Sequence, residues 1–533
     1  MGLGLSEDKL NLLDHALALS RIRFDTTSDF IFAPHLSIIY ERSGERLWEL
    51  LRGALKGQRY VPELPVKVEV PKSSGFSRPG IILSPFDRLA YQIAVDALVP
   101  QAERSLDRDR VFSYVPLGND TQGTMFEPPG DCYRRFTDKV GVLARDPEYP
   151  FALSVDVSSY FERIYQHILV SELESAGCDP ELVAFLTQLL SCFTEKDSHG
   201  IVQGVFPSDF LGTFYLGAID NQHRASCIPS ARYVDDMYLF FPSKRAARLH
   251  QIVLAAWLRK KALSLNEAKC QLAPSADLLD QETKVTHMFE AARQEGLEDF
   301  LERNDPYFSP PAPWDFVSEY GWVDFDDLDT IELEAIRSLF SLLEEIDESD
   351  RLYGQIEKYC LSAFAKAGDS TAVDYVLKQF PLRPHMASVY AVYLGSLARR
   401  DPQVARAAQA LTTQPDMCFD YQMMWLCAAL TNSDTLSGNT LDWALRGLSN
   451  HNCCEALRAV YPILLARFGT SFQHQLLRET YASEPSPYVQ AAILYSARYL
   501  PSNQRDIWIR IWRNASPLNG LVAEAVLSLP SSN

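Results

Sequence analysis

The chain has 533 residues, of which 47% are hydrophobic and 22% are charged, and this composition is ordinary for a globular protein. Its length exceeds that of one hydrophobic core and predicts two or three domains. No apolar run reaches the roughly 20 residues that span a bilayer, and the first residues lack the pattern of a secretory signal. We therefore expect a soluble, cytoplasmic protein that makes no membrane contact.

Charge and cysteine usage restrict the function further. The formal net charge is −19, and acidic residues outnumber basic ones both before and after Pro310. Such a chain is not a general nucleic-acid binder, so any polynucleotide has to be held by a local cleft. The ten cysteines are scattered without a Cys-x-x-Cys pair. This pattern indicates reduced thiols and excludes a disulfide framework or a zinc site.

Two kinds of apolar pattern alternate in the first part of the chain. Strand-like runs occur at Phe151–Val157 and Arg232–Phe241, and helix-like periodicity occurs at Asp87–Leu98 and Gln251–Ala262. We therefore predict a mixed α+β domain over residues 1–310.

A composition shift marks the end of this domain. Prolines cluster around residues 310–313 and cannot continue a helix. Between Asp315 and Asp350 there are thirteen acidic residues and a single basic one, Arg337. We expect an acidic junction between domains at residues 311–330.

The remainder, residues 331–533, has the texture of short helices separated by short breaks. Two architectures are compatible with it: paired helices stacked as HEAT-like repeats, which we favour, and an irregular helical bundle. The helical patterns cover Ile331–Ile346, Leu352–Ala367, Ala372–Phe380, Met386–Arg399, Gln403–Leu411, Tyr421–Leu430, Leu441–Leu448, Glu455–Phe468, Tyr488–Leu500 and Ile507–Trp512.

The strongest chemical signal is the adjacent pair Asp235 and Asp236, placed between apolar β-formers where a tight hairpin would turn. Two neighbouring carboxylates are costly to bury unless a divalent metal neutralises them, although such a pair alone could be an ordinary turn. Asp156 ends another apolar strand upstream, and a glycine-bracketed loop with Gln203 and Gly204 lies between the two segments.

Together these segments resemble a known family. In order, the stretches around Asp156, Gln203, Asp235 and Lys269 are similar to the palm motifs of bacterial-type reverse transcriptases. Segments similar to the fingers motifs of that family occur at 70–79 and 84–92, and the resemblance covers roughly residues 20–275. It implies a fingers and palm fold with an N-terminal helical extension.

The resemblance implies a catalytic centre for nucleotidyl transfer. Asp156, Asp235 and Asp236 would hold two Mg²⁺ ions, or Mn²⁺, with Val157 as a further member of the metal site. Lys269 is a candidate general acid for the departing pyrophosphate.

The resemblance also implies a nucleotide-binding set. Lys72 and Arg78 would clamp the triphosphate of the incoming dNTP. Gln203 and Gly204 would approach the incoming base pair and sugar, with Val202 in place of the proline usual in the family.

Phe161 lies where the family carries an aromatic steric gate that excludes ribonucleotides. The alternative is that Phe161 or its neighbour Tyr160 is simply a core residue.

The stretch Arg21–Asp25 and the helical C-terminal part resemble the abortive-infection group of this family. That resemblance implies an anti-phage role and a homo-oligomer, a trimer or hexamer. It also implies DNA synthesis that starts on a tyrosine hydroxyl, leaving the product covalently attached, with Tyr40 and Tyr60 as candidates. Synthesis in that group is either non-templated or copies a non-coding RNA.

Two functions follow. The first is an active RNA-directed DNA polymerase that uses dNTPs in phage defence. The second is a polymerase-like scaffold that binds nucleic acid without essential synthesis. The three carboxylates together with Lys72 and Arg78 favour the first, because a scaffold does not need a metal site.

Overall fold

The computed structural model describes residues 2–118, 123–279, 330–348 and 351–529. By its contacts the chain divides into two compact units, which we describe separately. Unit 1 comprises Met1–Ser28, Arg52–Leu64 and Asp87–Trp322, and unit 2 comprises Asp29–Leu51, Pro65–Phe86 and Val323–Asn533.

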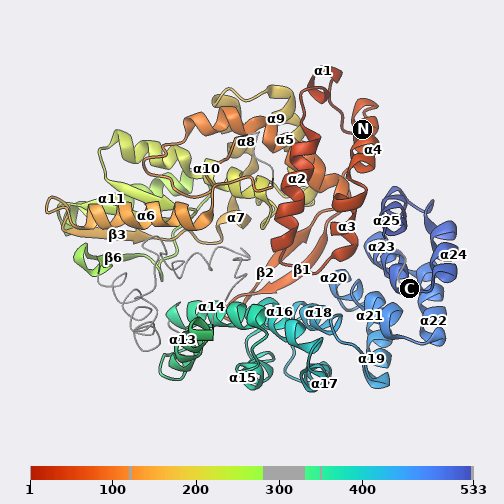
Figure 1. The fold of residues 1–533 in the computed structure, drawn as a ribbon. Helices are drawn as coiled ribbons and strands as arrows, with labels where there is room; N and C mark the ends of the chain where they lie inside the picture. The colour runs from red at the N-terminus through yellow and green to blue at the C-terminus, as the bar shows by residue number, and fades with distance from the viewer. Residues whose placement is uncertain (1, 119–122, 280–329, 349–350, 530–533) are drawn as a thin grey trace. The chain divides into compact units, whose positions relative to one another are not determined.

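Unit 1 is built on a four-stranded antiparallel sheet with the strand order β4-β5-β3-β6 (Figure 1). Strands β3 and β5 lie within the apolar runs from which the sequence predicted strands. Their bounds are β3 Phe151–Val155, β4 Ser230–Tyr233, β5 Asp236–Phe241 and β6 Gln271–Pro274.

Helices cover both faces of this sheet. Ala152 and Phe240 pack against α6 (Pro129–Ala144) in one apolar core cluster. Their neighbours along the strands point to the opposite face. There the ring of Phe241 lies 5.4 Å from that of His250 on α11 (Lys244–Lys260).

Unit 1 contains further helices. Two ion pairs join α2 to α5: Arg21 with Asp96 at 2.7 Å and Arg88 with Asp25 at 2.9 Å. Their bounds are α1 Glu7–Leu10, α2 His15–Asp25, α5 Pro85–Ala102, α7 Tyr160–Arg163, α8 Gln166–Ser175, α9 Pro180–Phe193 and α10 Phe206–Ala225, with short 3₁₀ helices η1 Thr26–Ser28 and η2 Glu103–Ser105. Helix α4 (Gly44–Lys56) begins in unit 2 and ends in unit 1.

Unit 2 is mostly helical, with one β-hairpin formed by β1 (Val66–Pro71) and β2 (Ser77–Ile82). An early helix, α3 (Pro34–Arg42), also belongs to it. The later helices are α13 Thr330–Ser341, α14 Arg351–Ala367, α15 Val373–Gln379, α16 Ala387–Ala398, α17 Pro402–Ala410, α18 Asp420–Leu430, α19 Gly438–Leu448, α20 Glu455–Arg458, α21 Tyr461–Phe468, α22 Ser471–Ser483, α23 Pro487–Ser496, α24 Ser502–Trp512 and α25 Pro517–Leu527, with 3₁₀ turns η3 Leu342–Glu344, η4 Pro384–Met386, η5 Leu411–Thr413 and η6 Ala497–Tyr499.

These helices stack in pairs. Helix α14 packs on α16 and α16 on α18, and the same step of two helices continues from α19 through α21 and α23 to α25. Figure 1 shows α14, α16 and α18 side by side in one row, with α15 and α17 in another. Stacked helical pairs are typical of α-solenoids. The assignment to HEAT-like repeats stays a prediction.

The early segments of unit 2 are fixed by late ones. The Ser43 hydroxyl donates a hydrogen bond to the carbonyl of Leu521 at 3.0 Å, and the Trp425 indole N–H donates to the carbonyl of Phe30 at 3.2 Å. The division by contacts therefore differs from the predicted domains 1–310 and 331–533, because the hairpin and α3 group with the helical part. The predicted junction 311–330 lies, apart from its last residue, outside the described residues.

Within the described part of the chain, no helix combines the length and apolar character needed to cross a bilayer.

Candidate active site

The two adjacent aspartates lie at a tight hairpin turn, as predicted. Tyr233 of β4 pairs with Asp236 of β5, which leaves Val234 and Asp235 as the turn. Val234 has a φ of +55°, a left-handed conformation that is unfavourable for a β-branched residue. Backbone strain of this kind is concentrated at functional sites because surrounding contacts have to maintain it.

Asp156 leaves β3 at the same end of the sheet. Strands β3 and β5 are antiparallel, with Val155 opposite Met237. Asp156, the residue after β3, therefore lies at the end of the sheet where β5 begins with Asp236. The two oxygens of the Asp156 carboxylate accept hydrogen bonds from Asn266 Nδ2 at 2.8 Å and from Lys269 Nζ at 3.1 Å. The structure thus brings Lys269 to the carboxylates, as an ion-pair partner of Asp156.

The carboxylates at the turn affect the ionisation of Asp235. Burial, together with the charges of Asp236 and Asp156, raises the pKa of Asp235 to about 7, and Lys269 opposes this shift. The site therefore carries more negative charge than its own residues neutralise. Oxygen ligands with excess negative charge suit Mg²⁺ by their chemistry.

The side chains are not arranged as a ready-made cage. Among the residues that the structure describes, no group of three or more His, Cys, Asp and Glu side chains could hold a metal ion. Both oxygens of Asp156 are engaged by Asn266 and Lys269 instead. By its chemistry the donor set fits a divalent ion, and binding one requires the carboxylates to move closer together than they lie in this structure.

The raised pKa of Asp235 predicts a pH-dependent stability difference. An unfolded aspartate titrates near 3.8 and the folded one near 7, so the wild-type protein loses stability as pH rises between these values. At pH 8 and without divalent ions, Asp235→Asn should therefore unfold at a higher temperature than the wild type. Its free energy of unfolding should be larger by about 2 kcal/mol, after allowance for solvent screening.

Thermal denaturation from pH 4 to pH 8 measures this difference. It should vanish at pH 4 and grow towards pH 7. The exposed Asp138→Asn on α6 serves as control and should track the wild type throughout. A pH-independent difference for Asp235→Asn would contradict the prediction.

The two aromatic residues after Asp156 have different environments. Tyr160 is the core residue, with 4% of its surface exposed, and its hydroxyl donates to the carbonyl of Gly212 on α10. Phe161 is half-buried, and a Cβ added at Gly212 would come within 2.9 Å of its ring. The ring of Phe161 thus packs directly on the backbone of α10.

The loop with Gln203 and Gly204 lies beside this segment. Just upstream of it, the amide of Ile201 donates to the carbonyl of Phe161 at 3.1 Å. Gly204 has a φ of +81°, which a side chain would disfavour, and both Gln203 and Gly204 are partly exposed. The structure therefore places the loop that carries Gln203 and Gly204 next to Phe161 in the chain's fold, and the roles of these residues towards a nucleotide stay predictions.

Comparison with known families agrees with this geometry. Residues 70–287 match the family model described as reverse transcriptase (RNA-dependent DNA polymerase). The chain carries a reverse transcriptase domain. This domain assigns the protein to the RNA-directed DNA polymerases, and its matched range includes all the carboxylates described above.

Other comparisons are more distant. No curated protein matches the chain. Among solved structures, one match is the structure of telomerase from Candida albicans in complex with a TWJ fragment of telomeric RNA, with 12% identity and a TM-score of 0.31. That match covers 70% of this chain and 71% of the telomerase chain.

Two predicted nucleotide-binding residues of the reverse transcriptase domain belong to unit 2. Arg78 lies on β2 opposite Val70, and Lys72 opens the loop of the same hairpin, where its amide donates to the carbonyl of Phe76 at 2.7 Å. The structure brings Lys72 and Arg78 together on one hairpin. Their roles towards a triphosphate stay predictions.

Neither priming candidate presents an accessible hydroxyl. Tyr40 is 1% exposed and Tyr60 is 5% exposed. The Tyr60 hydroxyl donates to Asp87, and burial together with that carboxylate raises the pKa of Tyr60 well above its usual value. A buried phenol cannot reach a substrate, and a raised pKa keeps the Tyr60 hydroxyl protonated, so burial argues against both residues as primers.

Sequence reasoning missed Asn266. Its side chain binds the Asp156 carboxylate, and its amide donates to the Asp156 carbonyl at 2.9 Å. The available signal was its position three residues before Lys269 in the same motif. A single asparagine in a loop carries no periodicity that marks it as a partner of a distant aspartate.

Proposed function

We propose that the protein is a defence-associated reverse transcriptase that adds dNTPs by nucleotidyl transfer at Asp156, Asp235 and Asp236. The observation that carries this proposal is the meeting of three carboxylates at one end of the palm sheet within a reverse transcriptase domain. Excess negative charge at this turn favours the binding of a metal ion, whereas in a purely structural turn it would only be destabilising.

The chain's own residues have distinct tasks. The carboxylates would hold the divalent ions, and Val157 could add only its main-chain carbonyl. Bound there, the ions would supply charge neutralisation and an activated hydroxyl. Lys269, 3.1 Å from Asp156 in this structure, would be released from that carboxylate and become able to donate a proton to the leaving group.

Substrate selection would use the residues around Phe161. Its half-buried ring on α10 would lie beneath the sugar, and Gln203 and Gly204 would contact the incoming base pair. Lys72 and Arg78, on a hairpin loop and its second strand, would bind the triphosphate. The fork of the arginine suits phosphate oxygens, and the lysine adds a point charge.

The test is synthesis by the purified full chain with Mg²⁺ and labelled dNTPs, with and without added RNA. DNA made only with Mg²⁺ and dNTPs supports the proposal. Product that shifts the protein on a denaturing gel and is removed by nuclease would support covalent priming, and sequencing distinguishes non-templated from RNA-copied DNA. Absence of synthesis with retained nucleic-acid binding would favour the scaffold function instead.

The defence role and the assembly follow from the abortive-infection resemblance and need separate tests. Expression in bacteria should reduce phage plaque formation, and the reduction should depend on the carboxylates. The mass in solution should correspond to a trimer or a hexamer, because stacked helices offer an extended surface.

Phe161→Ala should relax sugar selection. Removal of the ring opens space for a 2′-hydroxyl, so incorporation of ribonucleotides relative to deoxyribonucleotides should rise by about tenfold or more. Single-turnover incorporation of matched rNTP and dNTP pairs measures the ratio. Phe161→Tyr keeps the ring and serves as control. An unchanged ratio in Phe161→Ala would make Phe161 a packing residue only.

A further inference from the structure

The backbone of the Val234–Asp235 turn is held on both sides. The Val234 amide donates to Ser113 Oγ at 2.9 Å, and the Val234 carbonyl accepts from Arg232 Nη1 at 2.7 Å. A β-branched residue in the left-handed region costs about 1–3 kcal/mol. These two hydrogen bonds are therefore the contacts that offset the strain at the turn.

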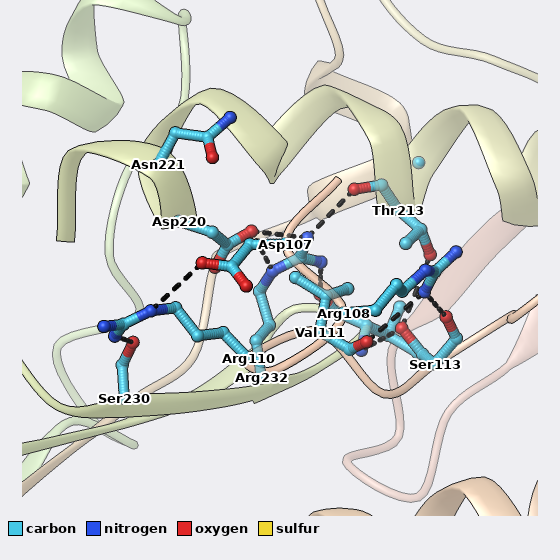
Figure 2. A network of polar contacts seen from close by, with 12 residues as sticks. Asp107, Arg108, Arg110, Val111, Ser113, Thr213, Asp220, Asn221, Ser230 and Arg232 are labelled. Atoms are coloured by element: carbon cyan, nitrogen blue, oxygen red, sulfur yellow. Dashed lines mark hydrogen bonds and ion pairs between the residues drawn. The ribbon is translucent and has the colours of Figure 1, made fainter. Parts of the chain in front are cut away.

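The guanidinium of Arg232 is itself fixed. Its Nε and Nη2 donate to one oxygen of Asp220 at 2.9 and 2.7 Å, and Nη2 also donates to the carbonyl of Thr213 at 3.0 Å (Figure 2). The side chains of Arg232 and Asp220 are only 1% and 2% exposed. Buried charges of this kind persist only where the pairing geometry is good.

The opposite support, Ser113, is held by a second arginine. Arg108 donates to the carbonyls of Ser113 at 2.9 Å and Val111 at 3.3 Å, and Glu103 binds Arg108 through both carboxylate oxygens at 2.7 Å. Figure 2 shows this arginine beside Ser113, close to Thr213 of α10. The hydroxyl that accepts from Val234 is thus part of a fixed loop.

Both Thr213 and Asp220 lie on α10, which begins two residues after Gly204. One helix therefore connects the loop proposed for the incoming nucleotide with the arginine that holds the proposed metal site. We infer that Arg232, held by Asp220, is a positioning residue that keeps the Val234–Asp235 turn in its left-handed conformation and couples metal binding to α10. This inference rests on the proposed polymerase function.

Arginine is required for this task because of its shape. One planar guanidinium reaches Asp220, Thr213 and Val234 at the same time through separate N–H groups. A lysine ammonium at this position is a point charge on a flexible stem and can satisfy the carboxylate without reaching the turn. Arg232→Lys therefore separates charge pairing from positioning.

The first measurement compares Arg232→Lys with Arg110→Lys in the full chain. Arg110 contacts the other end of β4, at the carbonyl of Ile228 and the hydroxyl of Ser230. We expect Arg232→Lys to lower kcat by about 10- to 100-fold, because a displacement of about 1 Å at a reacting centre costs this much. It should also raise the Mg²⁺ concentration for half-maximal activity, whereas Arg110→Lys stays close to wild type.

A second readout does not depend on activity. Binding of Mn²⁺ is measured by the loss of the EPR signal of the free ion. The affinity for Mn²⁺ should fall about tenfold in Arg232→Lys, equivalent to about 1.4 kcal/mol. If the wild type binds Mn²⁺ but makes no DNA, the proposed function fails while this comparison still tests the positioning role. Wild-type Mn²⁺ affinity and Mg²⁺ dependence in Arg232→Lys would overturn the inference.

Rescue provides the decisive control. Glycine adopts positive φ without strain, so adding Val234→Gly to Arg232→Lys should restore part of the Mn²⁺ affinity and of kcat. A purely structural role for Arg232 predicts no rescue, and that result would also overturn the inference. Should Arg232→Lys fail to fold, Ser113→Ala removes the acceptor of the Val234 amide, together with a long 3.4 Å contact to Thr213 Oγ1, and should show the same metal-dependent loss in smaller measure.

Discussion

The double variant Asp235→Ala/Asp236→Ala should lose DNA synthesis almost completely while remaining folded. Both carboxylates belong to the proposed metal site, and the metal contributes several kcal/mol to the transition state. The expected loss is therefore about 10³-fold or more in kcat. The fold should survive because the substitution removes a buried carboxylate and its repulsion by a like charge. Both of these raise the pKa of Asp235.

Primer extension with Mg²⁺ and labelled dNTPs measures the loss, and circular dichroism with thermal denaturation checks the fold. Asp138→Ala on the exposed face of α6 is the matched control, since it removes an aspartate from the same unit. Full synthesis by the double variant would refute the assignment of the active site. In the phage assay the same variant should give no protection.

The second large effect concerns stability of the helical unit. Arg458→Met should destabilise unit 2 by about 3–5 kcal/mol, because it leaves the buried Glu484 carboxylate without its partner. The two side chains are 3% and 1% exposed, and Arg458 Nε also donates to the carbonyl of Leu448 at 3.0 Å.

Chemical denaturation measures this effect, with two comparison variants. Arg46→Met breaks an ion pair with Glu49 in which both side chains are more than half exposed, 52% and 63%, and should cost less than about 1 kcal/mol. Arg458→Met/Glu484→Leu removes both buried charges and should recover much of the loss. Equal effects of Arg458→Met and Arg46→Met would show that the buried pair contributes no more than a surface one.

Local patterns predicted much of the fold. The apolar run Phe151–Val157 is β3, and the run Arg232–Phe241 is a hairpin whose turn falls at the aspartates. Helical periodicity located most of the later helices. The predicted helix Glu455–Phe468 is divided into α20 and α21, because Pro462 lacks an amide for the helix ladder.

Other elements were not predicted. Helices α22 and α25 have no counterpart among the predicted ones. In α22 the buried residues are only Leu477 and Tyr481, so its apolar stripe is too thin to stand out. In α25 nearly every residue from Leu518 to Val526 is buried, which removes the alternation with polar residues that periodicity needs.

The polar partners of the site were beyond sequence reasoning for a different reason. Arg232 stands between Ala231 and Tyr233 in an apolar strand, and the sequence alone predicted no partner for it. Only the fold identifies Asp220 as this partner among the 69 acidic residues, because the place where α10 crosses the strand decides which carboxylate lies next to Arg232. The same holds for Asn266 and Asp156, which are 110 residues apart.

The exchange of segments between the two units has a consequence for how the protein is made. Ser43, just after α3, finds its partner Leu521 478 residues later in the chain. A ribosome adds about 5–20 residues per second, so α3 leaves it between about 24 and 96 s before its binding surface on α25 exists. During that time Ile38 and Ile39, which are 4% and 0% exposed in the finished fold, have no native cover from the last helices. Unit 2 can complete its folding only after α25 has been synthesised.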